Sequence, residues 1–379
     1  MKRLAVVFQS FVRAGSQRHL VEILKGIRLF RPELECTLFL IDAPRDAWGT
    51  FLPEIQQADI SVINAPYVFQ RKNDPSLISR LHDWLSRHYL ERKLNQSFYR
   101  QLADFDTVVC AEFFVADLLL PNLHPRQRLC FHLMEHLAQR TDFAHYRLLR
   151  HPRLNLIFMH PSQIDQLPLK LTVDKTITWL VRLCPDHFHD PETTHPGNNR
   201  TLRISHYSRI SPMRLIDQLI DAFSLLHEQT DCSLRIAGHI EDSAYHQRLL
   251  AQIERLGLRN AVSFAEPVPS PAEDPYRSSV DLVWMISLSS HIGYAGIESM
   301  AAGLPTLFLE VDARASISQP DPELASLICT RPQQLVERSL ALKADPASFC
   351  RQQGQLVRDR FMTTQSGIDE LIGFYLCSR

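Results

Sequence analysis

The amino-acid sequence predicts an α/β protein that contains two doubly wound parallel sheets. Short apolar runs alternate with longer amphipathic stretches along the chain, and this alternation is typical of parallel strands joined by crossover helices. A length of 379 residues suits two domains. A polar stretch rich in breakers, residues 186–199, divides the alternation into two halves and indicates a linker.

The first half begins with a buried strand at Leu4–Phe8 and a helix whose apolar face includes Leu20 and Ile27. Further strands are expected at these ranges: Thr37–Ile41, Ser61–Ile63, Thr107–Cys110, Leu129–Leu133 and Leu156–Met159. A long helical region, Ser76–Leu102, lies between two of them. Residues 1–185 are therefore expected to form an N-terminal domain.

The second half repeats the pattern after the linker. Its expected strands are Leu202–His206, Ser233–Ala237, Val262–Phe264, Leu282–Ile286, Thr306–Leu309 and Ser326–Cys329. Its expected helices are Ile216–Leu226, Tyr245–Leu256, Tyr294–Ala302, Gln333–Ala344 and Ile368–Cys377. In the first of these helices, Leu219, Ile220 and Phe223 form part of an apolar stripe that can face a sheet. We expect a C-terminal domain at 200–360 and a last helix, 361–379, that packs back on the N-terminal domain.

Composition and charge argue against several classes of protein. Acidic and basic residues nearly cancel, to a formal net charge of −1, so no strong overall field favours nucleic acid. The eight cysteines include no C-x-x-C pair, which favours reduced thiols over a disulfide framework or a metal site. The N-terminal apolar run is too short for a signal peptide, and no run approaches the roughly 20 residues that span a bilayer. We therefore expect a cytoplasmic location.

The stretch Asp281–Glu310 predicts a ligand site. Its strand is followed by a loop of small and polar residues, Ser287–Gly293, and by a helix that ends at Gly303, where a left-handed cap is expected. The loop joins the carboxyl end of a strand to the amino end of a helix, where N–H groups and the helix dipole favour a phosphate. Glu298 lies about one turn into the helix, where its carboxylate can accept hydrogen bonds from two sugar hydroxyls. These features predict a nucleotide or sugar-phosphate ligand.

Three segments of the second half resemble the GT-B glycosyltransferases, in particular the retaining glycosyltransferase family 4, or glycosyl transferases group 1. The segment Ser208–Phe223 (SRISPMRLIDQLIDAF) resembles one in which the family has an Arg and, five residues later, a Lys; here these are Arg209 and Arg214. Leu234–Val268 resembles the family's strand–Gly–helix–strand run through the nucleotide site. Ser290–Leu307 resembles its Glu-x7-Glu segment. The resemblance implies two Rossmann-like domains facing a cleft.

A fourth, shorter resemblance lies in the first half. Arg13–Leu24 (RAGSQRHLVEIL) is similar to the family's glycine-containing loop at the first helix, although Ala14 here precedes Gly15 where the family has paired glycines. The resemblance implies that the backbone at Gly15 and Ser16 approaches the donor's diphosphate. An ordinary helix N-cap at Ser16 is the structural alternative. The N-terminal domain would then be the acceptor side and the C-terminal domain would bind the donor.

The resemblance gives chemical roles to two arginines and one glutamate. Breaking the bond between a sugar and a nucleoside diphosphate leaves growing negative charge on the diphosphate. Arg209 and Arg214 are suited to stabilise that charge by charge-assisted hydrogen bonds, and the family uses this cation pair in place of a metal, so no metal or other cofactor is expected. Glu298 matches the second acid of Glu-x7-Glu, which holds the ribose hydroxyls. A solvated arginine pair and an exposed helix glutamate are the structural alternatives.

The loop before this glutamate departs from the family pattern. Ser290 replaces the first acid of Glu-x7-Glu, and His291 follows where the family has a glycine. That acid lies against the donor sugar in the family, so its replacement leaves the sugar and the stereochemistry open. Ser290 and His291 are expected to contact sugar or phosphate, with a plain loop histidine as the alternative for His291. The donor-binding loop continues through Ile292, Gly293 and Tyr294.

Three further residues are candidates for the site. Gly238, after the strand Ser233–Ala237, resembles a glycine near the nucleotide base, and an ordinary loop turn is the alternative. Glu266 is a candidate for the rim that binds the base. His132, near a strand end, is a candidate catalytic residue that would contact the donor sugar or the acceptor. The alternative for His132 is a core histidine with satisfied hydrogen bonds.

The helical region Ser76–Leu102 is basic and amphipathic. Such a helix can lie on an anionic membrane, and many members of the family act on lipid-linked acceptors there. The alternative is a helix that packs on the first sheet with its basic face in water. The nearby Asp104–Asp106 (DFD) matches D-x-D, the metal–diphosphate motif of the other major glycosyltransferase fold. It precedes its strand and is interpreted as a polar turn.

Together these features predict a metal-independent, retaining glycosyltransferase of bacterial-type glycan synthesis. It would move a sugar from a UDP- or GDP-sugar to a hydroxyl of a glycan, lipid-linked or protein acceptor. Three alternatives stay open: an inverting protein O-glycosyltransferase, which the run from Gly296 also resembles; a nucleotide-sugar epimerase, which would consume donor without acceptor; and a non-catalytic sugar-nucleotide-binding relative, suggested by Ser290. No G-x-G-x-x-G follows the first strand, which disfavours a dinucleotide-dependent dehydrogenase.

Overall fold

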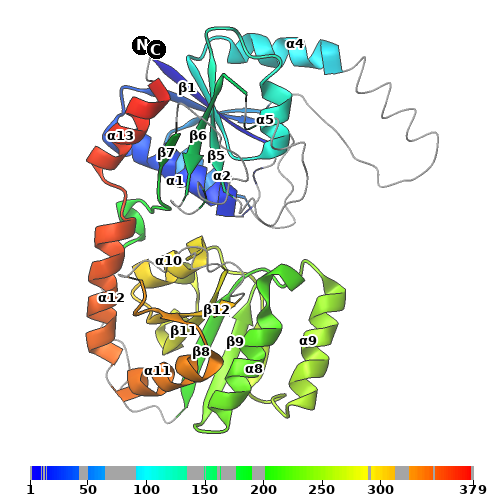
Figure 1. Cartoon of the computed structure of the whole chain (residues 1–379), viewed down its shortest axis with the longest axis vertical. Coiled ribbons are helices and arrows are strands. Elements are labelled where there is room, and N and C mark those ends of the chain that lie inside the picture. The colour runs from blue at the N-terminus through cyan, green and yellow to red at the C-terminus, as the bar shows by residue number, and fades with distance from the viewer. Residues whose placement is uncertain are drawn as a thin grey trace, which may run out of the picture. The chain divides into compact units, whose positions relative to one another are not determined.

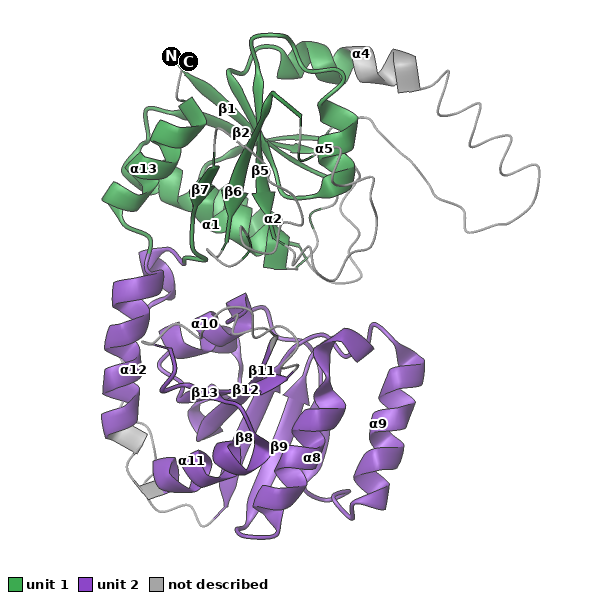
Figure 2. Ribbon diagram, viewed as in Figure 1, with its two compact units in different colours: residues 1–182, 363–379 green, residues 183–362 purple. Residues whose placement is uncertain are grey.

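The computed structural model describes most of the chain in these ranges: residues 2–9, 11, 13, 15–41, 50–64, 91–134, 149, 151–159, 163, 176–189, 201–288, 292–311, 324–344 and 346–376. The chain divides into two compact units. Unit 1 comprises residues 1–182 and 363–379, and unit 2 comprises residues 183–362 (Figure 2). Each unit contains a parallel sheet with helices on both faces, which confirms the predicted fold class.

The described strands of unit 1 form a seven-stranded sheet with the order β3-β2-β1-β4-β5-β6-β7. Their bounds are β1 (Arg3–Phe8), β2 (Glu35–Leu40), β3 (Ser61–Asn64), β4 (Thr107–Cys110), β5 (Arg128–Leu133), β6 (Leu154–Phe158) and β7 (Thr176–Thr178). Every pairing between them is parallel. The interior strand β1 pairs Val6 with Leu38 of β2 and with Val109 of β4. Burial on both faces explains the continuous apolar runs of the sequence.

Alternate residues of β1 face two separate cores. Leu4, Val6 and Phe8 pack with the helices of one face, and Ala5 and Val7 pack with those of the other. The first face carries α1 (Gly15–Phe30), α2 (Leu52–Gln57) and α13 (Gln365–Leu376), and the second carries α4 (Glu91–Leu102) and α5 (Phe113–Leu119) (Figure 1). The C-terminal helix α13 is thus part of unit 1.

The helix α4 is the described part of the basic region Ser76–Leu102. Its Phe98 and Leu102 are buried, and the Phe98 ring lies 5.9 Å from the ring of Phe39, centroid to centroid. The hydroxyl of Tyr99 donates a hydrogen bond of 2.8 Å to the carbonyl of Leu118. The side chains of Phe98, Tyr99 and Leu102 therefore pack against unit 1, as expected for a helix that packs on the first sheet. Residues 76–90 lie outside the described residues. Within the described part of the chain, no helix combines the length and the apolar character needed to cross a membrane.

The described strands of unit 2 form a six-stranded parallel sheet with the order β10-β9-β8-β11-β12-β13. Their bounds are β8 (Leu202–Tyr207), β9 (Cys232–Ala237), β10 (Val262–Ala265), β11 (Leu282–Leu288), β12 (Thr306–Val311) and β13 (Ile328–Cys329). The strand order runs outward in both directions from β8 and β11. Helices cover both faces (Figure 1): α8 (Ile216–His227), α9 (Ser243–Arg255) and α11 (Pro332–Ala344) on one, α10 (Tyr294–Ala301) and α12 (Pro346–Phe361) on the other.

Candidate active site

The predicted donor-site residues of unit 2 follow strands that are neighbours in the sheet. β8 pairs in parallel with β11, through Ile204 with Leu282 and Ser205 with Val283, so the loops after both strands leave the same edge. The strand order reverses direction at this pair, and ligands of open α/β sheets bind outside the carboxyl ends of strands at such a point. Arg209 belongs to the loop after β8. The loop after β11 includes residues 289–291, and therefore Ser290 and His291, which lie outside the described residues.

The loop after β8 has an unusual backbone conformation at its end. A short 3-10 turn, Pro212–Arg214, is followed by Leu215 in the left-handed region, with φ +50° and ψ 37°. A branched residue in that region costs about 1–3 kcal/mol, and such conformations persist only where the surroundings enforce them. Ile216, the first residue of α8, is fully buried and fixes the end of the turn. The backbone that presents Arg214 is therefore held in a strained conformation.

The loops after β8 and β9 are joined by backbone hydrogen bonds. Ile210 N–H donates to His239 O at 2.8 Å, and Glu241 N–H donates to Ile210 O at 3.1 Å. Gly238 lies where the loop after β9 comes against the loop after β8. A Cβ at this position would lie 2.7 Å from the carbonyl carbon of Ser208 and closer still to the carbonyl oxygen. Gly238 is thus required for the close packing of the β9 loop against the backbone that leads to Arg209, a role that differs from an ordinary loop turn.

Two cationic side chains, Arg209 and Arg214, belong to the segment between β8 and α8 at this edge. Arg209 donates a hydrogen bond to Glu241, with 2.8 Å between Nη1 and Oε1. Burial lowers the pKa of Arg214, and the positive charge of Arg209 lowers it further while the charge of Glu241 raises it. An influence of Arg209 on Arg214 means that the two guanidinium groups are within electrostatic range. Such a pair favours an anion that can bind both groups.

His206 connects the two central strands beneath these loops. Its Nδ1 lies 2.8 Å from the carbonyl oxygen of Trp284 in β11, and its Nε2 lies 2.7 Å from Oγ of Ser208. Burial lowers the pKa of His206 to about 4, the hydrogen bond to Trp284 opposes this, and the nearby charge of Arg214 adds to it. The ring is therefore neutral at pH 7, with Nδ1–H donating to the carbonyl. The sequence interpretation missed this residue.

The helix α10 begins at the same edge. Gly293 is its N-cap, with extended backbone, and its carbonyl accepts from Gly296 N–H at 3.0 Å. The first N–H groups of such a helix point away from the helix and favour an anion. Ile292 and Tyr294, on either side of Gly293, are buried. Gly303, just beyond the helix, has φ +77°, which confirms the predicted left-handed cap.

Glu298 lies in the second turn of α10 and is only 9% exposed. The residues around it in the helix are also buried, so its carboxylate is not the exposed helix glutamate of the structural alternative. Burying a carboxylate is costly unless hydrogen bonds or charges compensate. A buried acid on a helix that begins beside the strand switch point suits recognition of ligand hydroxyls. Glu266, by contrast, is exposed and directly follows β10.

In unit 1, the candidates Gly15 and Ser16 are the first two residues of α1. The N-cap interpretation of Ser16 is wrong, because the helix already begins at Gly15. Ser16 Oγ donates to Oε1 of Gln17 at 2.8 Å, and Gln17 Nε2 donates to Oε1 of Glu112 at 3.0 Å. The other carboxylate oxygen of Glu112, which follows β4, accepts from the backbone N–H of Gln9 at 2.7 Å. Glu112, also missed from sequence, thus links the ends of β1 and β4 to the start of α1.

His132 lies inside β5, and its side chain is fully buried. Its Nδ1 lies 2.8 Å from Nε2 of His19 in α1, and its Nε2 lies 2.6 Å from the hydroxyl of Tyr375 in α13. Both ring nitrogens are therefore engaged within unit 1. This corrects the prediction that His132 contacts a sugar, because the ring joins α1, β5 and α13 in the core of the unit, as in the core-histidine alternative.

The buried histidines of unit 1 predict a loss of stability at acid pH. Burial lowers the pKa of His19 from its ordinary 6.5 to about 3, and burial together with His19 lowers that of His132 well below 6.5. The unfolded chain therefore binds these protons more readily, so stability present above about pH 6.5 falls as the pH drops towards 3. Urea midpoints measured from pH 7 to pH 4.5 should decrease steeply. Replacing both histidines by leucine should flatten this dependence, whereas the exposed-site variant His124→Gln should keep it; an unchanged slope in the double variant contradicts the prediction.

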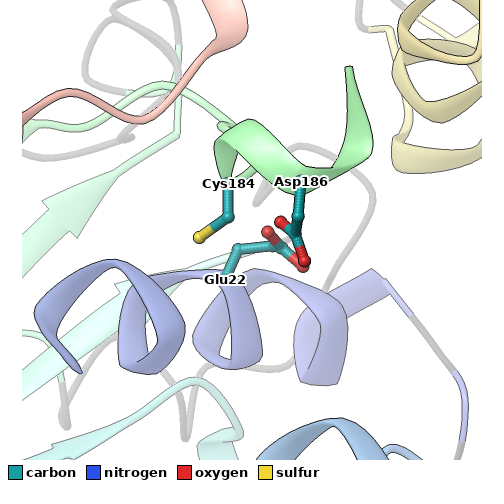
Figure 3. A group of neighbouring side chains, drawn as sticks. All are labelled: Glu22, Cys184 and Asp186. Atoms are coloured by element: carbon teal, nitrogen blue, oxygen red, sulfur yellow. The ribbon is translucent and has the colours of Figure 1, made fainter. Parts of the chain in front are cut away.

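Figure 3 draws three side chains of metal-binding type: Glu22 on α1, Asp186 inside the short 3-10 turn Pro185–His187, and Cys184 directly before that turn. Glu22 belongs to unit 1 and the other two residues to unit 2. Inside unit 1, Glu22 accepts from Arg18 at 3.2 Å, and Lys25 lies 3.8 Å away, so its charge is balanced by cations. Taken unit by unit, the described residues contain no set of three His, Cys, Asp or Glu side chains close enough to share a metal ion.

Comparison with known proteins gives one family match and several matches in fold. Residues 193–356 match the family model described as Glycosyl transferases group 1. No curated protein sequence matches the chain significantly.

Solved structures match over both units. Anabaena HepE in complex with UDP and glucose superposes with a TM-score of 0.72 at 16% identity, covering 100% of both chains. S. aureus TarM in complex with fondaparinux, alpha-GlcNAc-glycerol and UDP gives 0.69 at 10% identity over 100% of both chains. WaaG, a glycosyltransferase involved in lipopolysaccharide biosynthesis, gives 0.61 at 14% identity, covering 99% of this chain and 100% of its own. Unit 2 therefore carries a glycosyl transferases group 1 domain, and the protein is a glycosyltransferase with the GT-B fold.

Proposed function

We propose that this glycosyltransferase moves a sugar from a UDP- or GDP-sugar to a hydroxyl of a glycan, lipid-linked or protein acceptor. The observation that carries the proposal is the pair Arg209 and Arg214 at the switch point of the unit 2 sheet. Support comes from the complexes of HepE with UDP and with UDP-glucose, and from the complex of TarM with UDP and glycan ligands. Residues 200–360 would bind the donor, and residues 1–185 with the helix at 361–379 would form the acceptor side.

The proposed mechanism uses charge stabilisation by protein cations. As the bond between sugar and diphosphate breaks, Arg209 and Arg214 would stabilise the charge that develops on the leaving oxygen, and no metal would be required. The amino end of α10, from Gly293, would bind a phosphate through its N–H groups. Glu298 would accept hydrogen bonds from the ribose hydroxyls.

Stereochemistry depends on the loop that includes Ser290 and His291. In a retaining transfer the leaving phosphate takes the acceptor's proton, so no dedicated base is needed. The second candidate is an inverting transfer, favoured by the serine at the position of the first acid of Glu-x7-Glu. The anomeric configuration of the product, measured by NMR, separates the two. Donor consumption in the absence of acceptor would instead indicate an epimerase.

A thermal-shift measurement tests the donor class. UDP or GDP should raise the melting temperature of the protein in the presence of EDTA, because only a ligand that prefers the folded state does so. The Glu298→Ala variant should lose most of this shift, since one charge-assisted hydrogen-bond acceptor is worth about 1.5–3 kcal/mol. The exposed Glu254→Gln variant on α9 is the control and should behave as wild type. A shift that strictly needs Mg²⁺ or Mn²⁺ contradicts the metal-independent mechanism.

A further inference from the structure

Glu241 forms an ion pair with one of the two proposed diphosphate ligands. Its Oε1 lies 2.8 Å from Nη1 of Arg209, and the side chains of Glu241 and Arg209 are 32% and 34% exposed. Partly exposed ion pairs of this kind contribute little net stability, so a ligand anion can replace one of the partners. Arg209 therefore has a protein carboxylate as an ion-pair partner, at the position where a ligand anion would also bind.

The backbone holds this carboxylate in place. Glu241 and Asp242 both donate their N–H groups to the carbonyl of Ile210, at 3.1 and 3.2 Å, and Ile210 is the residue next to Arg209. Asp242 has a separate role, since its Oδ1 caps α9 by accepting from Tyr245 N–H at 2.8 Å. Glu241 is thus the acid of this loop that is directed to the arginine, and its position does not depend on the ion pair alone.

Glu241 also acts on the second arginine. Its negative charge favours the charged form of Arg214, against the effects of burial and of Arg209. The carboxylate therefore lies within electrostatic range of both guanidinium groups. The charge of Glu241 offsets the effect of Arg209 on Arg214. With a diphosphate on the same groups, its charge repels the ligand.

We propose that Glu241 is a counterion that the diphosphate displaces from Arg209, and that it thereby limits the affinity of the enzyme for nucleoside diphosphates. The inference rests on the proposed function, because it takes Arg209 as a diphosphate ligand. An enzyme of this kind releases a nucleoside diphosphate after each transfer, and release of product limits the turnover of many enzymes. A carboxylate that weakens diphosphate binding favours that release.

Isothermal titration calorimetry of UDP and GDP in EDTA tests the proposal. The Glu241→Gln variant should bind the preferred nucleotide about three- to tenfold more tightly than wild type, the effect of one partly screened charge. Added salt should reduce the difference. In an Arg209→Gln background the same substitution should tighten binding by a smaller factor than in wild type, because the ion pair that the diphosphate displaces is absent there and only the longer-range repulsion by Glu241 remains. Glu254→Gln removes an equal charge from an exposed position of α9 and should leave the affinity unchanged.

The possible failures are distinguishable. If Arg209→Gln weakens nucleotide binding but Glu241→Gln leaves it unchanged or weaker, the counterion role is overturned and the proposed function stands. If wild type binds neither nucleotide, the proposed function fails and the inference fails with it. The Glu241→Ala variant provides a second substitution at the same position, with the same tightening expected.

Discussion

The Arg214→Gln variant is expected to lose about 10²- to 10³-fold in kcat/KM for sugar transfer, since one donor to a developing oxyanion is worth about 2.7–4 kcal/mol. Arg214 is the better shielded of the two arginines, as the lowering of its pKa by burial indicates. A charge in a partly desolvated position interacts more strongly with the leaving diphosphate than a solvated one does. Steady-state kinetics with the donor found by the thermal-shift screen would measure the loss.

Two further variants make this prediction specific. Arg214→Lys keeps the charge at the position where the resembled family has a lysine, and we expect it to retain activity within about tenfold of wild type. Arg259→Gln is the control, because Arg259 is exposed and precedes β10. It therefore lies near the amino ends of the strands, whereas Arg209 and Arg214 follow the carboxyl end of β8. Its activity should match wild type. If Arg214→Gln stays within about threefold of wild type, well under the loss expected for such a donor, Arg214 does not stabilise the leaving group.

The Gly238→Ala variant is expected to destabilise unit 2 by about 1–3 kcal/mol, the usual cost of an overpacked site. The added Cβ would overlap the carbonyl of Ser208, and the nearest atoms belong to the backbone, so no side-chain rotation can relieve the contact. The loop that carries Arg209 must then move. We therefore expect both a lower melting temperature and a lower kcat/KM.

Gly354→Ala is the matched control for this substitution. An added Cβ at Gly354 in α12 has nothing within 4 Å, and alanine is the better helix former, so its melting temperature should be equal or higher. A Gly238→Ala protein that keeps both the melting temperature and the kcat/KM of wild type contradicts the close packing of the two loops.

Periodicity predicted much of the fold because buried parallel strands have a distinct sequence pattern. The strand Thr107–Cys110 was predicted with its observed bounds, since it is apolar and lies between polar turns. The sequence interpretation missed β7, a three-residue strand at the edge of the sheet, which has too few residues for periodicity to be detected. It also missed α5, which has only seven residues.

The helix α12 was missed for a different physical reason. It starts at Pro346, which is tolerated in a first helical turn, and a polar side chain occupies one of its core positions. Gln353 is buried, where its Oε1 accepts from Thr306 N–H at 2.9 Å and its Nε2 donates to Leu304 O at 3.0 Å. A pattern search for apolar residues cannot detect a helix that buries an amide in this way.

The candidate site residues also differ in how far the sequence alone could predict them. Arg209, Arg214 and Glu298 are predicted as site residues because each lies in a local motif after a strand, and their roles stay predictions. The partners Glu241 and Glu112 were not found, because they act across strands that are distant in the sequence. The place of His132 near a strand end predicts a site residue, but His19 of α1 and Tyr375 of α13 bind both of its ring nitrogens, and these contacts are not visible in the sequence.

The most direct test of the account compares the affinities of UDP and uridine, or of GDP and guanosine, measured by calorimetry in EDTA. The wild-type protein should bind the preferred diphosphate at least about 100-fold more tightly than its nucleoside, because two charge-assisted contacts depend on the phosphates. The double variant Arg209→Gln/Arg214→Gln should lose most of this ratio while its affinity for the nucleoside stays unchanged. A ratio that survives the double substitution would show that the diphosphate does not bind to this pair of arginines.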